Sequence, residues 1–410
     1  MFSNPCNLLI LFCVVTLLSY LFNIISEKSK IPSLILLIGT GLILHRVSIY
    51  YEIQILSLRF PLELLGIVGL IMIVLEGAMD LKITLDKKPI IIKSFTAGAS
   101  VLFFTSFSIA GILIFYGNID FRTALVYAVP MGVISSAIAI PTATNLSSEK
   151  KEFIIYESTF SDILGIMMFN YVIAKELLTW GALQVFVWSL LLIIYHSLLS
   201  TLLLLWLSKY LNSHLKVLPI LSILILLYAF AKMIHLPSLF LILVFGMVIN
   251  NIPSILKNVP VQLKAPLTRI FDPEKLSIVG IELKSMTSEL AFLIRTFFFL
   301  LFGFTMDLSL LASIDVLITG SLIILVILLI RFIFLKFILK TNIFPELFIA
   351  PRGLITILLF YSIPAQFISE KFNEGVIVFV IVASSLIMMV GIFFSKKKYN
   401  VENELELLKG

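Results

Sequence analysis

The chain has 410 residues, of which 60% are hydrophobic and 13% charged, and its mean hydropathy is +1.12. This composition excludes a water-soluble globular fold and predicts an all-α polytopic membrane protein. The net charge of +6 is expected from the Lys and Arg excess of cytoplasmic loops, and not from nucleic-acid binding. The two cysteines, Cys6 and Cys13, suggest neither a disulfide framework nor a Cys-based metal site.

Apolar runs of about 17 or more residues, separated by prolines and charged clusters, predict thirteen transmembrane helices. The first run, 8–25, has no basic residue before it and no clear small-residue cleavage site. It is therefore expected to be a spanning helix and not a removed signal peptide. The thirteen expected helices lie near 7–25, 31–48, 60–80, 89–116, 122–146, 153–174, 181–208, 217–233, 234–250, 289–307, 312–338, 344–368 and 375–394.

Lys and Arg residues are distributed unequally among the connections between these helices. The odd-numbered connections and the C-terminal tail hold 20 of the 30, whereas the N-terminus and the even-numbered connections hold six. By the positive-inside rule, the N-terminus is expected outside a plasma (inner) membrane and the C-terminus in the cytoplasm. The tail, 396–410, begins with three lysines and suits a cytoplasmic surface of anionic lipid. The longest connection, 251–288, is expected to be a cytoplasmic loop.

Two segments near the ends of the third and tenth helices resemble each other. Residues 74–81 and 300–308 both place a glycine inside an apolar run and Met-Asp-Leu at its exit. If helices 2–6 and 9–13 are repeated units, they start on opposite sides of the membrane, which predicts the inverted repeat common in secondary transporters. The expected parts are a first helix (1–30), repeat 1 (31–175), linker helices (176–233), repeat 2 (234–395) and the tail (396–410).

The corresponding fifth and twelfth helices of these repeats both contain helix-breaking residues. The fifth carries Pro130, Gly132, Ser135, Ser136 and Pro141, and the twelfth carries Pro351, Gly353 and Pro364. Proline removes a backbone donor, so both helices are expected to be discontinuous, with a kinked but continuous helix as the alternative. Freed carbonyls and half-helix termini can bind a cation without further charged side chains.

Two carboxylates, Glu157 and Asp162, lie inside the apolar run 153–174. Helical spacing puts Glu157 and Ser161 on one face, and Ser158 and Asp162 on a neighbouring face. A charged side chain at the bilayer centre costs at least roughly 2.5 to 3.5 kcal/mol, and such residues usually mark ion or proton pathways. The pattern favours an ion site, with solvated or interhelix-bonded residues near a helix end as the alternative.

With these residues assembled, the chain resembles the monovalent cation/proton antiporter superfamily, which includes the sodium/proton exchangers. The resemblance covers nearly the whole membrane portion. Its most specific part is the segment 157–162, Glu-Ser-Thr-Phe-Ser-Asp, which is similar to the family's Glu-Ser-x-x-Asn-Asp motif on the sixth of thirteen helices. Weaker matches are Glu76-Gly77 on the third helix, Arg331 on the eleventh, and Ala350-Pro351-Arg352-Gly353 at the start of the twelfth.

The resemblance implies a role for each matching residue. Asp162 is expected to bind the cation and the proton alternately. Glu157 and Arg331 are expected to form an interhelix ion pair, which leaves Asp162 free to titrate. Apart from the resemblance, Arg352 is expected either to position a half-helix or to bind lipid phosphate at the cytoplasmic face. The other expected contributors to the cation site are Ser158, Glu76, Ser161 and backbone carbonyls near Ser136 and Ala137.

The chain departs from the family pattern at two points. Ser161 stands where the family has Asn or Asp before the key aspartate, and the family's Thr-Asp-Pro is absent from 137–141. Relatives that move net charge have two adjacent aspartates at the first point. Since Ser161 cannot carry a second proton, electroneutral exchange of one cation for one proton is expected, although Glu76 could also titrate.

The expected substrates are a proton and a monovalent cation, with sodium placed before lithium and potassium, and no cofactor is expected. Hard oxygen ligands suit these ions, and no His or Cys cluster suggests a transition metal. The alternatives are a potassium/proton antiporter or efflux system and, from another class, a cation channel, which needs a continuous pore. No Gly-x-Ser-x-Gly or His-Glu-x-x-His motif suggests an enzyme. The resemblance also implies a homodimer.

Overall fold

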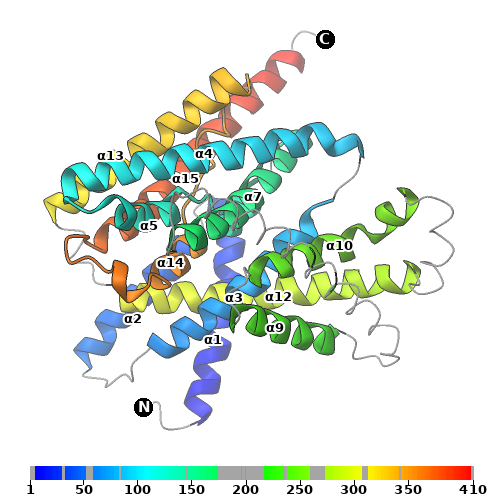
Figure 1. Cartoon of the computed structure of the whole chain (residues 1–410), viewed down its shortest axis with the longest axis horizontal. Coiled ribbons are helices and arrows are strands. Elements are labelled where there is room, and N and C mark those ends of the chain that lie inside the picture. Colours follow the sequence, from blue (N-terminus) through cyan, green and yellow to red (C-terminus); the bar gives the residue numbers. More distant parts are fainter. Residues whose placement is uncertain are drawn as a thin grey trace. The chain divides into compact units, whose positions relative to one another are not determined.

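The structure, a computed structural model, describes residues 5–29, 33–51, 59–82, 85–143, 146–173, 195, 199, 217–233, 238–258, 273–306, 313–340 and 343–407 (Figure 1). Throughout this part of the chain the regular secondary structure is helical, which confirms the predicted all-α class. The chain forms two compact units. Unit 1 contains Met1–Ile67, Lys93–Gly165 and Leu293–Gly410, and unit 2 contains Val68–Ile92 and Ile166–Phe292.

The described helices have lengths and compositions suited to a membrane. Their bounds are α1 Pro5–Ser29, α2 Ser33–Tyr50, α3 Arg59–Asp80, α4 Lys88–Gly117, α5 Phe121–Gly132, α6 Ser136–Thr142, α7 Ser148–Ile173, α9 Val217–Met233, α10 Ser238–Asn258, α12 Pro273–Thr305, α13 Ile314–Ile333, α14 Leu354–Tyr361 and α15 Gly375–Leu407. Among the described residues, five segments are long and apolar enough to cross a bilayer: Lys88–Gly117, Phe121–Ile140, Ser277–Thr305, Ile314–Ile338 and Gly375–Phe394.

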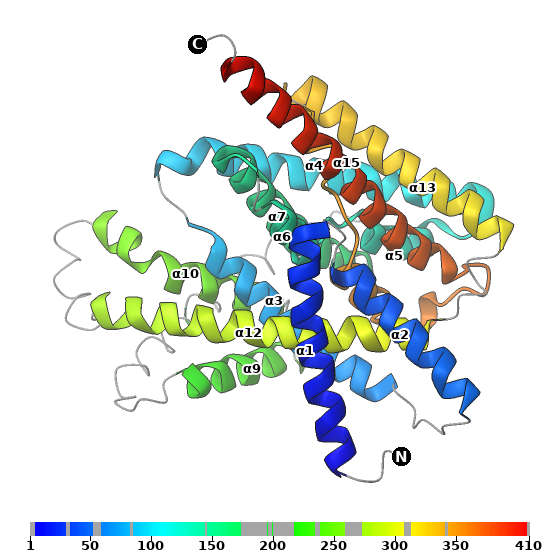
Figure 2. The ribbon, with the colours of Figure 1, turned by 180° about the vertical axis from the view of Figure 1, so that it is seen from behind.

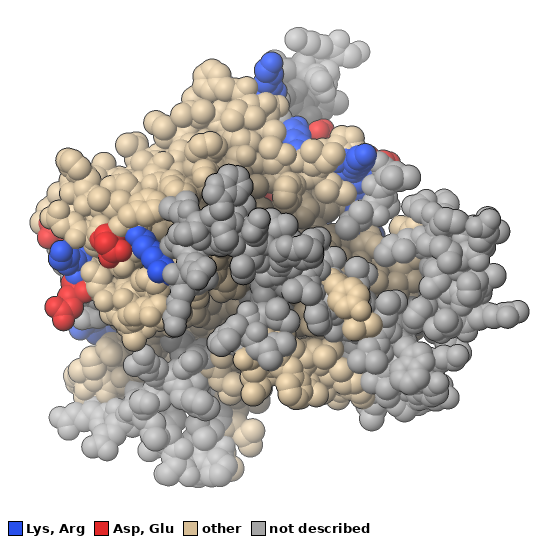
Figure 3. Space-filling view, viewed as in Figure 1, with Lys and Arg blue, Asp and Glu red and all other residues tan. Residues whose placement is uncertain are grey.

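Large apolar side chains cover much of the described surface. On α4, Phe103, Phe104 and Phe115 are 50%, 55% and 79% exposed, and Leu325 on α13 is 60% exposed. On the face shown in Figure 3, charged side chains occupy few of the described positions. Soluble monomers rarely expose contiguous apolar surface on this scale, so these helices suit a lipid environment.

In unit 1, small residues allow helices to approach closely. α13 and α15 lie side by side (Figure 2), and the Phe379 ring packs directly against Gly320. A Cβ on Gly41 of α2 would collide with the backbone of α12 at Leu300, and a Cβ on Gly303 of α12 would collide with the backbone of α2. Close backbone contact at small residues is typical of helix packing in membranes, where van der Waals packing is a main attraction.

In unit 2, α10 and α12 hold the C-terminal end of α3. The side-chain amides of Asn250 and Asn251 donate to the carbonyl oxygen of Leu81 at 3.2 and 2.7 Å. Lys284 Nζ lies 2.8 Å from Asp80 Oδ1. Because the last carbonyls of a helix have no partner within it, these contacts satisfy and fix the end of α3.

The observed elements differ from the predicted ones in the segment expected to be a loop, whereas both helices expected to be discontinuous are interrupted. α10 ends at Asn258 and α12 begins at Pro273, so residues 251–258 and 273–288, expected to lie in a loop, are helical. Charged residues can extend a helix beyond the bilayer, where an apolar run no longer marks it. The expected helix 344–368 is regular only over α14, and the expected helix 122–146 is divided into α5 and α6. The expected helix 181–208 lies almost entirely outside the described residues, and the inverted repeat stays a prediction.

Candidate functional site

The break between α5 and α6 is local and well defined. Pro130 lies in the last turn of α5, and residues 133–135 form a non-helical segment, with Val133 and Ser135 extended. At the other end, Asp120 caps α5 by accepting a hydrogen bond from the N–H of Thr123 at 3.0 Å. The predicted discontinuity of this helix is therefore present as two half-helices.

A second non-helical segment, 349–353, precedes α14 and crosses the first. The N–H of Ser135 donates to the carbonyl oxygen of Pro351 at 2.9 Å, so the two segments are joined backbone to backbone. Gly353 makes this approach possible, because a Cβ there would lie 2.5 Å from Ile138 Cδ1 and 2.8 Å from Ser135 Oγ. A larger residue would force the side chains of Ile138 and Ser135 to shift.

Arg352 is completely buried beside this crossing. Its Nε donates to the carbonyl of Met131 at 2.8 Å and its Nη2 to that of Gly132 at 3.2 Å, while Nη1 donates to Ala350. The first two carbonyls lie at the C-terminal end of α5, where the helix dipole favours a positive charge. Of the two roles expected for Arg352, the geometry corresponds to positioning a half-helix, because a buried guanidinium cannot reach lipid phosphate.

Two glycines let α7 pack closely, one against α4 and the other against the break. Gly98 of α4 packs against the backbone of Glu157 and Ser161, with a hypothetical Cβ only 3.0 Å from the Glu157 carbonyl oxygen. Gly165 packs against the side chain of Val133, inside the break. These contacts place the motif segment of α7 directly beside residues 133–136.

Asp162 and Ser161 bind the broken segment from α7. Ser161 Oγ accepts a hydrogen bond from the N–H of Ile134 at 3.0 Å, and Asp162 Oδ2 accepts one from the N–H of Ser136 at 3.1 Å. Asp162 is 4% exposed, and its Oδ1 is buried and accepts no hydrogen bond from the residues that the structure describes. A buried carboxylate with one oxygen left open is costly unless a proton or a cation compensates it.

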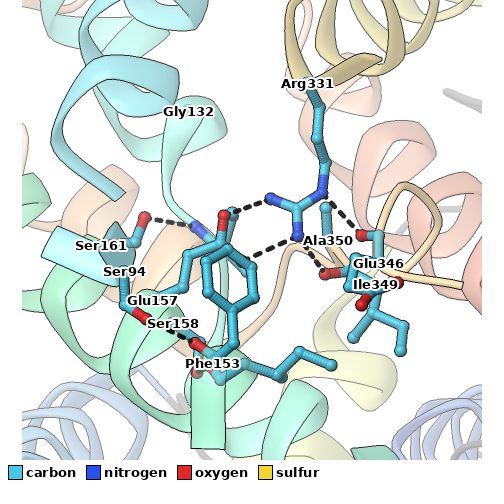
Figure 4. Close-up of polar contacts among 12 residues, drawn as sticks. Ser94, Gly132, Phe153, Glu157, Ser158, Ser161, Arg331, Glu346, Ile349 and Ala350 are labelled. Atoms are coloured by element: carbon cyan, nitrogen blue, oxygen red, sulfur yellow. Dashed lines mark hydrogen bonds and ion pairs between the residues drawn. The ribbon is translucent and has the colours of Figure 1, made fainter. Parts of the chain in front are cut away.

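Glu157 has the opposite environment on the same helix. Arg331 of α13 binds it through two parallel hydrogen bonds, Nη1 to Oε1 at 2.7 Å and Nη2 to Oε2 at 2.8 Å (Figure 4). Arg331 also donates from Nε to the carbonyl of Glu346 at 2.8 Å and from Nη2 to that of Ile349 at 3.2 Å. Both charged side chains are buried, at 0% and 1% exposure, so the pair is internally neutral and fully hydrogen-bonded.

The sequence matches a known protein family. The model of the family described as "Sodium/hydrogen exchanger, transmembrane" matches residues 13–396. The chain belongs to the sodium/hydrogen exchanger family. No curated protein sequence matches the chain.

Solved structures of an exchanger share the fold. The structure of the sodium proton antiporter MjNhaP1 from Methanocaldococcus jannaschii at pH 8 matches with a TM-score of 0.65 and 20% identity, over 94% of this chain and 97% of that one. A structure of the same antiporter from an electron microscopy map matches with a TM-score of 0.65 and 19% identity, over 99% of both chains. At this identity the likeness shows the fold alone, and the family match places the chain among multi-pass transporters of cations and protons.

Three further residues were predicted for the exchanger's cation site, and the structure describes each of them. Ser158 is buried, and its hydroxyl donates to the carbonyl of Ile154 one turn earlier in α7, at 2.7 Å. Glu76 lies in unit 2, near the end of α3, and is partly buried. Its contribution to the site stays a prediction. Ala137 is the second residue of α6, directly after Ser136.

Sequence analysis missed one ion pair beside the site. Lys150, in the first turn of α7, contacts Glu346 at 3.0 Å. Lys150 precedes Glu157 by seven positions and so lies on the same face of α7. That spacing was visible in the sequence, but nothing in the sequence indicated that Glu346 would lie opposite.

Proposed function

We propose that this exchanger moves a monovalent cation in exchange for a proton, with sodium as the first candidate. Both ions are proposed to bind in turn to Asp162. The observation that carries the proposal is the state of this carboxylate. It is buried beside a broken helix, with Oδ2 held by one backbone N–H and Oδ1 unbonded within the described residues. A cation or a proton can occupy the open oxygen, but not both together.

Charge balance makes the two ions compete. Glu157 is neutralised by Arg331, so it has no need of a transported ion. Burial disfavours an uncompensated charge on Asp162, which therefore holds either a proton or a cation when it is closed off from water. Each ion is released when the other binds, and exchange follows if the site opens alternately to the two sides.

The ligand set proposed for the cation consists of hard oxygens. The candidates in unit 1 are Asp162 Oδ1, the Ser158 hydroxyl and backbone carbonyls near Ser136 and Ala137, and the role of Glu76 stays an expectation from the sequence. Oxygen ligands suit sodium, lithium and potassium. Ser161 adds no titratable group next to Asp162, which supports electroneutral exchange of one cation for one proton.

The Lys and Arg asymmetry supports an N-terminus outside and a C-terminus in the cytoplasm, and two contacts support the proposed grouping of the connections on the two sides. The fourth and twelfth connections, both assigned to the outside, touch where Lys371 Nζ donates to the carbonyl of Asn118 at 3.0 Å. The fifth connection, assigned to the cytoplasm, meets the cytoplasmic start of the expected twelfth helix at Lys150 and Glu346. We place the protein in the plasma membrane as a homodimer.

Proton flux in liposomes tests the proposal. The purified protein is reconstituted with a pH-sensitive dye inside, and sodium, lithium or potassium is added outside. Sodium is expected to move protons in wild-type vesicles but not in vesicles with Asp162→Asn. A response to potassium alone would instead support the potassium/proton alternative. Flux that varies with a membrane potential imposed by an ionophore would contradict electroneutral exchange.

A further inference from the structure

Glu346 is a largely buried carboxylate outside the ion site, and it has a specific partner. It is 6% exposed and lies in the turn 344–348, between α13 and α14. Lys150 Nζ lies 3.0 Å from each of its two carboxylate oxygens and donates to the carbonyl of Phe344 at 2.7 Å. Lys150 therefore binds both a side chain and a backbone carbonyl of this turn.

The same turn is also bound by the ion pair next to the site. Arg331 Nε donates to the backbone carbonyl of Glu346, so this residue uses its side chain for Lys150 and its backbone for Arg331. Lys150 and Glu157 lie seven positions apart on one face of α7, and both are tied to the segment 344–349, Lys150 directly and Glu157 through Arg331. The segment is thus fixed to α7 at two points.

This segment continues into the crossing that holds Asp162. Five residues after Glu346, the carbonyl of Pro351 accepts the hydrogen bond from Ser135, and the next N–H, that of Ser136, binds Asp162 Oδ2. A displacement of the turn 344–348 therefore has a short, hydrogen-bonded path both to the Glu157–Arg331 pair and to the carboxylate that binds the ions.

We propose that Lys150 and Glu346 form a positioning pair for the ion site, which sets how tightly Asp162 binds the cation by holding the segment 344–351 against α7. The inference rests on the proposed function. Neither residue touches the transported ion. They act as outer partners of the site, in the way that groups behind a metal ligand fix its orientation.

The unequal burial of the two partners predicts unequal effects. Lys150→Met leaves the Glu346 carboxylate almost fully buried and unpaired, which is the costly half of a broken ion pair. Glu346→Gln removes that charge, and Lys150, whose side chain is 29% exposed, keeps water and the Phe344 carbonyl as partners. Lys150→Met is therefore expected to disturb the site more than Glu346→Gln.

The test measures sodium-dependent proton flux in liposomes as a function of sodium concentration. Lys150→Met is expected to raise the sodium concentration for half-maximal flux by roughly 10-fold, the lower end of the loss seen when outer partners of a site are removed. Glu346→Gln is expected to raise it less, and the double variant no more than Lys150→Met alone, because the two residues act as a unit. The conservative variant Lys150→Arg is expected to keep the sodium concentration for half-maximal flux at the wild-type value.

Lys151→Met is the matched control, because Lys151 is the adjacent lysine of α7 and lies on a different face. A loss of folded protein lowers the maximal flux but leaves the half-saturating concentration unchanged, which separates it from a positioning effect. An unchanged half-saturating concentration in Lys150→Met, or equal changes in Lys150→Met and Lys151→Met, would overturn the inference. Absence of flux in the wild type would instead contradict the proposed function.

Discussion

Glu157 and Asp162 lie five positions apart on α7 and are buried to nearly the same extent, at 1% and 4% exposure. They differ in what compensates their charge. Both oxygens of Glu157 are bound by the guanidinium of Arg331, whereas Asp162 receives one backbone N–H and keeps one oxygen open among the described residues. Burial by itself does not identify a transport site. A buried carboxylate without a permanent counter-ion is the one that needs a mobile ion.

The largest expected effect is at the open carboxylate. Asp162→Asn keeps the side chain's shape and its acceptor for the N–H of Ser136, but it removes the carboxylate that we propose alternates between proton and cation. Cation-dependent proton flux is expected to fall to that of empty liposomes. The melting temperature in detergent is expected to stay at or above the wild-type value, because a costly buried charge is gone. Retained flux would show that another residue carries the ions.

Arg331→Met tests the compensated carboxylate. It leaves Glu157 buried without its partner, which is expected to lower the free energy of unfolding by about 3 to 5 kcal/mol. Denaturant or thermal unfolding in detergent measures this loss. The double variant with Glu157→Gln is the control, and it is expected to recover most of the stability because no unpaired charge remains. A double variant as unstable as Arg331→Met would assign the loss to packing instead.

Gly353→Ala tests the crossing of the two broken segments, which holds Asp162 in place. The added methyl would lie 2.5 Å from Ile138 Cδ1, so a cost of about 1 to 3 kcal/mol from overpacking is expected, together with reduced flux. Gly111→Ala on α4 is the matched control, since a Cβ there has no heavy atom within 4 Å. Equal effects of the two substitutions would show that the close approach at Gly353 has no special role.

The smallest effect is expected at the exposed cap of α5. Asp120→Ala removes the acceptor for the N–H of Thr123 and is expected to cost about 0.5 to 1 kcal/mol while leaving the cation dependence of flux unchanged. That hydrogen bond lowers the pKa of Asp120 below its usual value. The cap therefore stabilises the fold above the ordinary pKa of an aspartate, and its contribution is lost as the pH falls through the lowered pKa. Unfolding measured from neutral to acidic pH should show the wild type converging on Asp120→Ala.

Sequence by itself determined the class of this protein and the chemistry of its motif. The apolar runs predicted membrane helices, since only helices or closed barrels satisfy the backbone in lipid. Pro130 and Gly132 indicated the break after α5, and the residues Glu157 to Asp162 indicated an ion site, because buried charge is expensive wherever it occurs. These conclusions follow from local composition and helical spacing.

Tertiary structure decided which of the buried groups are paired. Glu157 and Arg331 are 174 positions apart, and Lys150 and Glu346 are 196 positions apart. The family resemblance predicted the pair of Glu157 and Arg331, which helical spacing could not predict. Nothing in the sequence predicted that Glu346 would pair with Lys150. The hydrogen bond of Ser135 to Pro351 and those of Arg352 to the end of α5 likewise join segments that are far apart in the sequence. Long-range packing therefore decides where charge is compensated, and so which carboxylate is left for an ion.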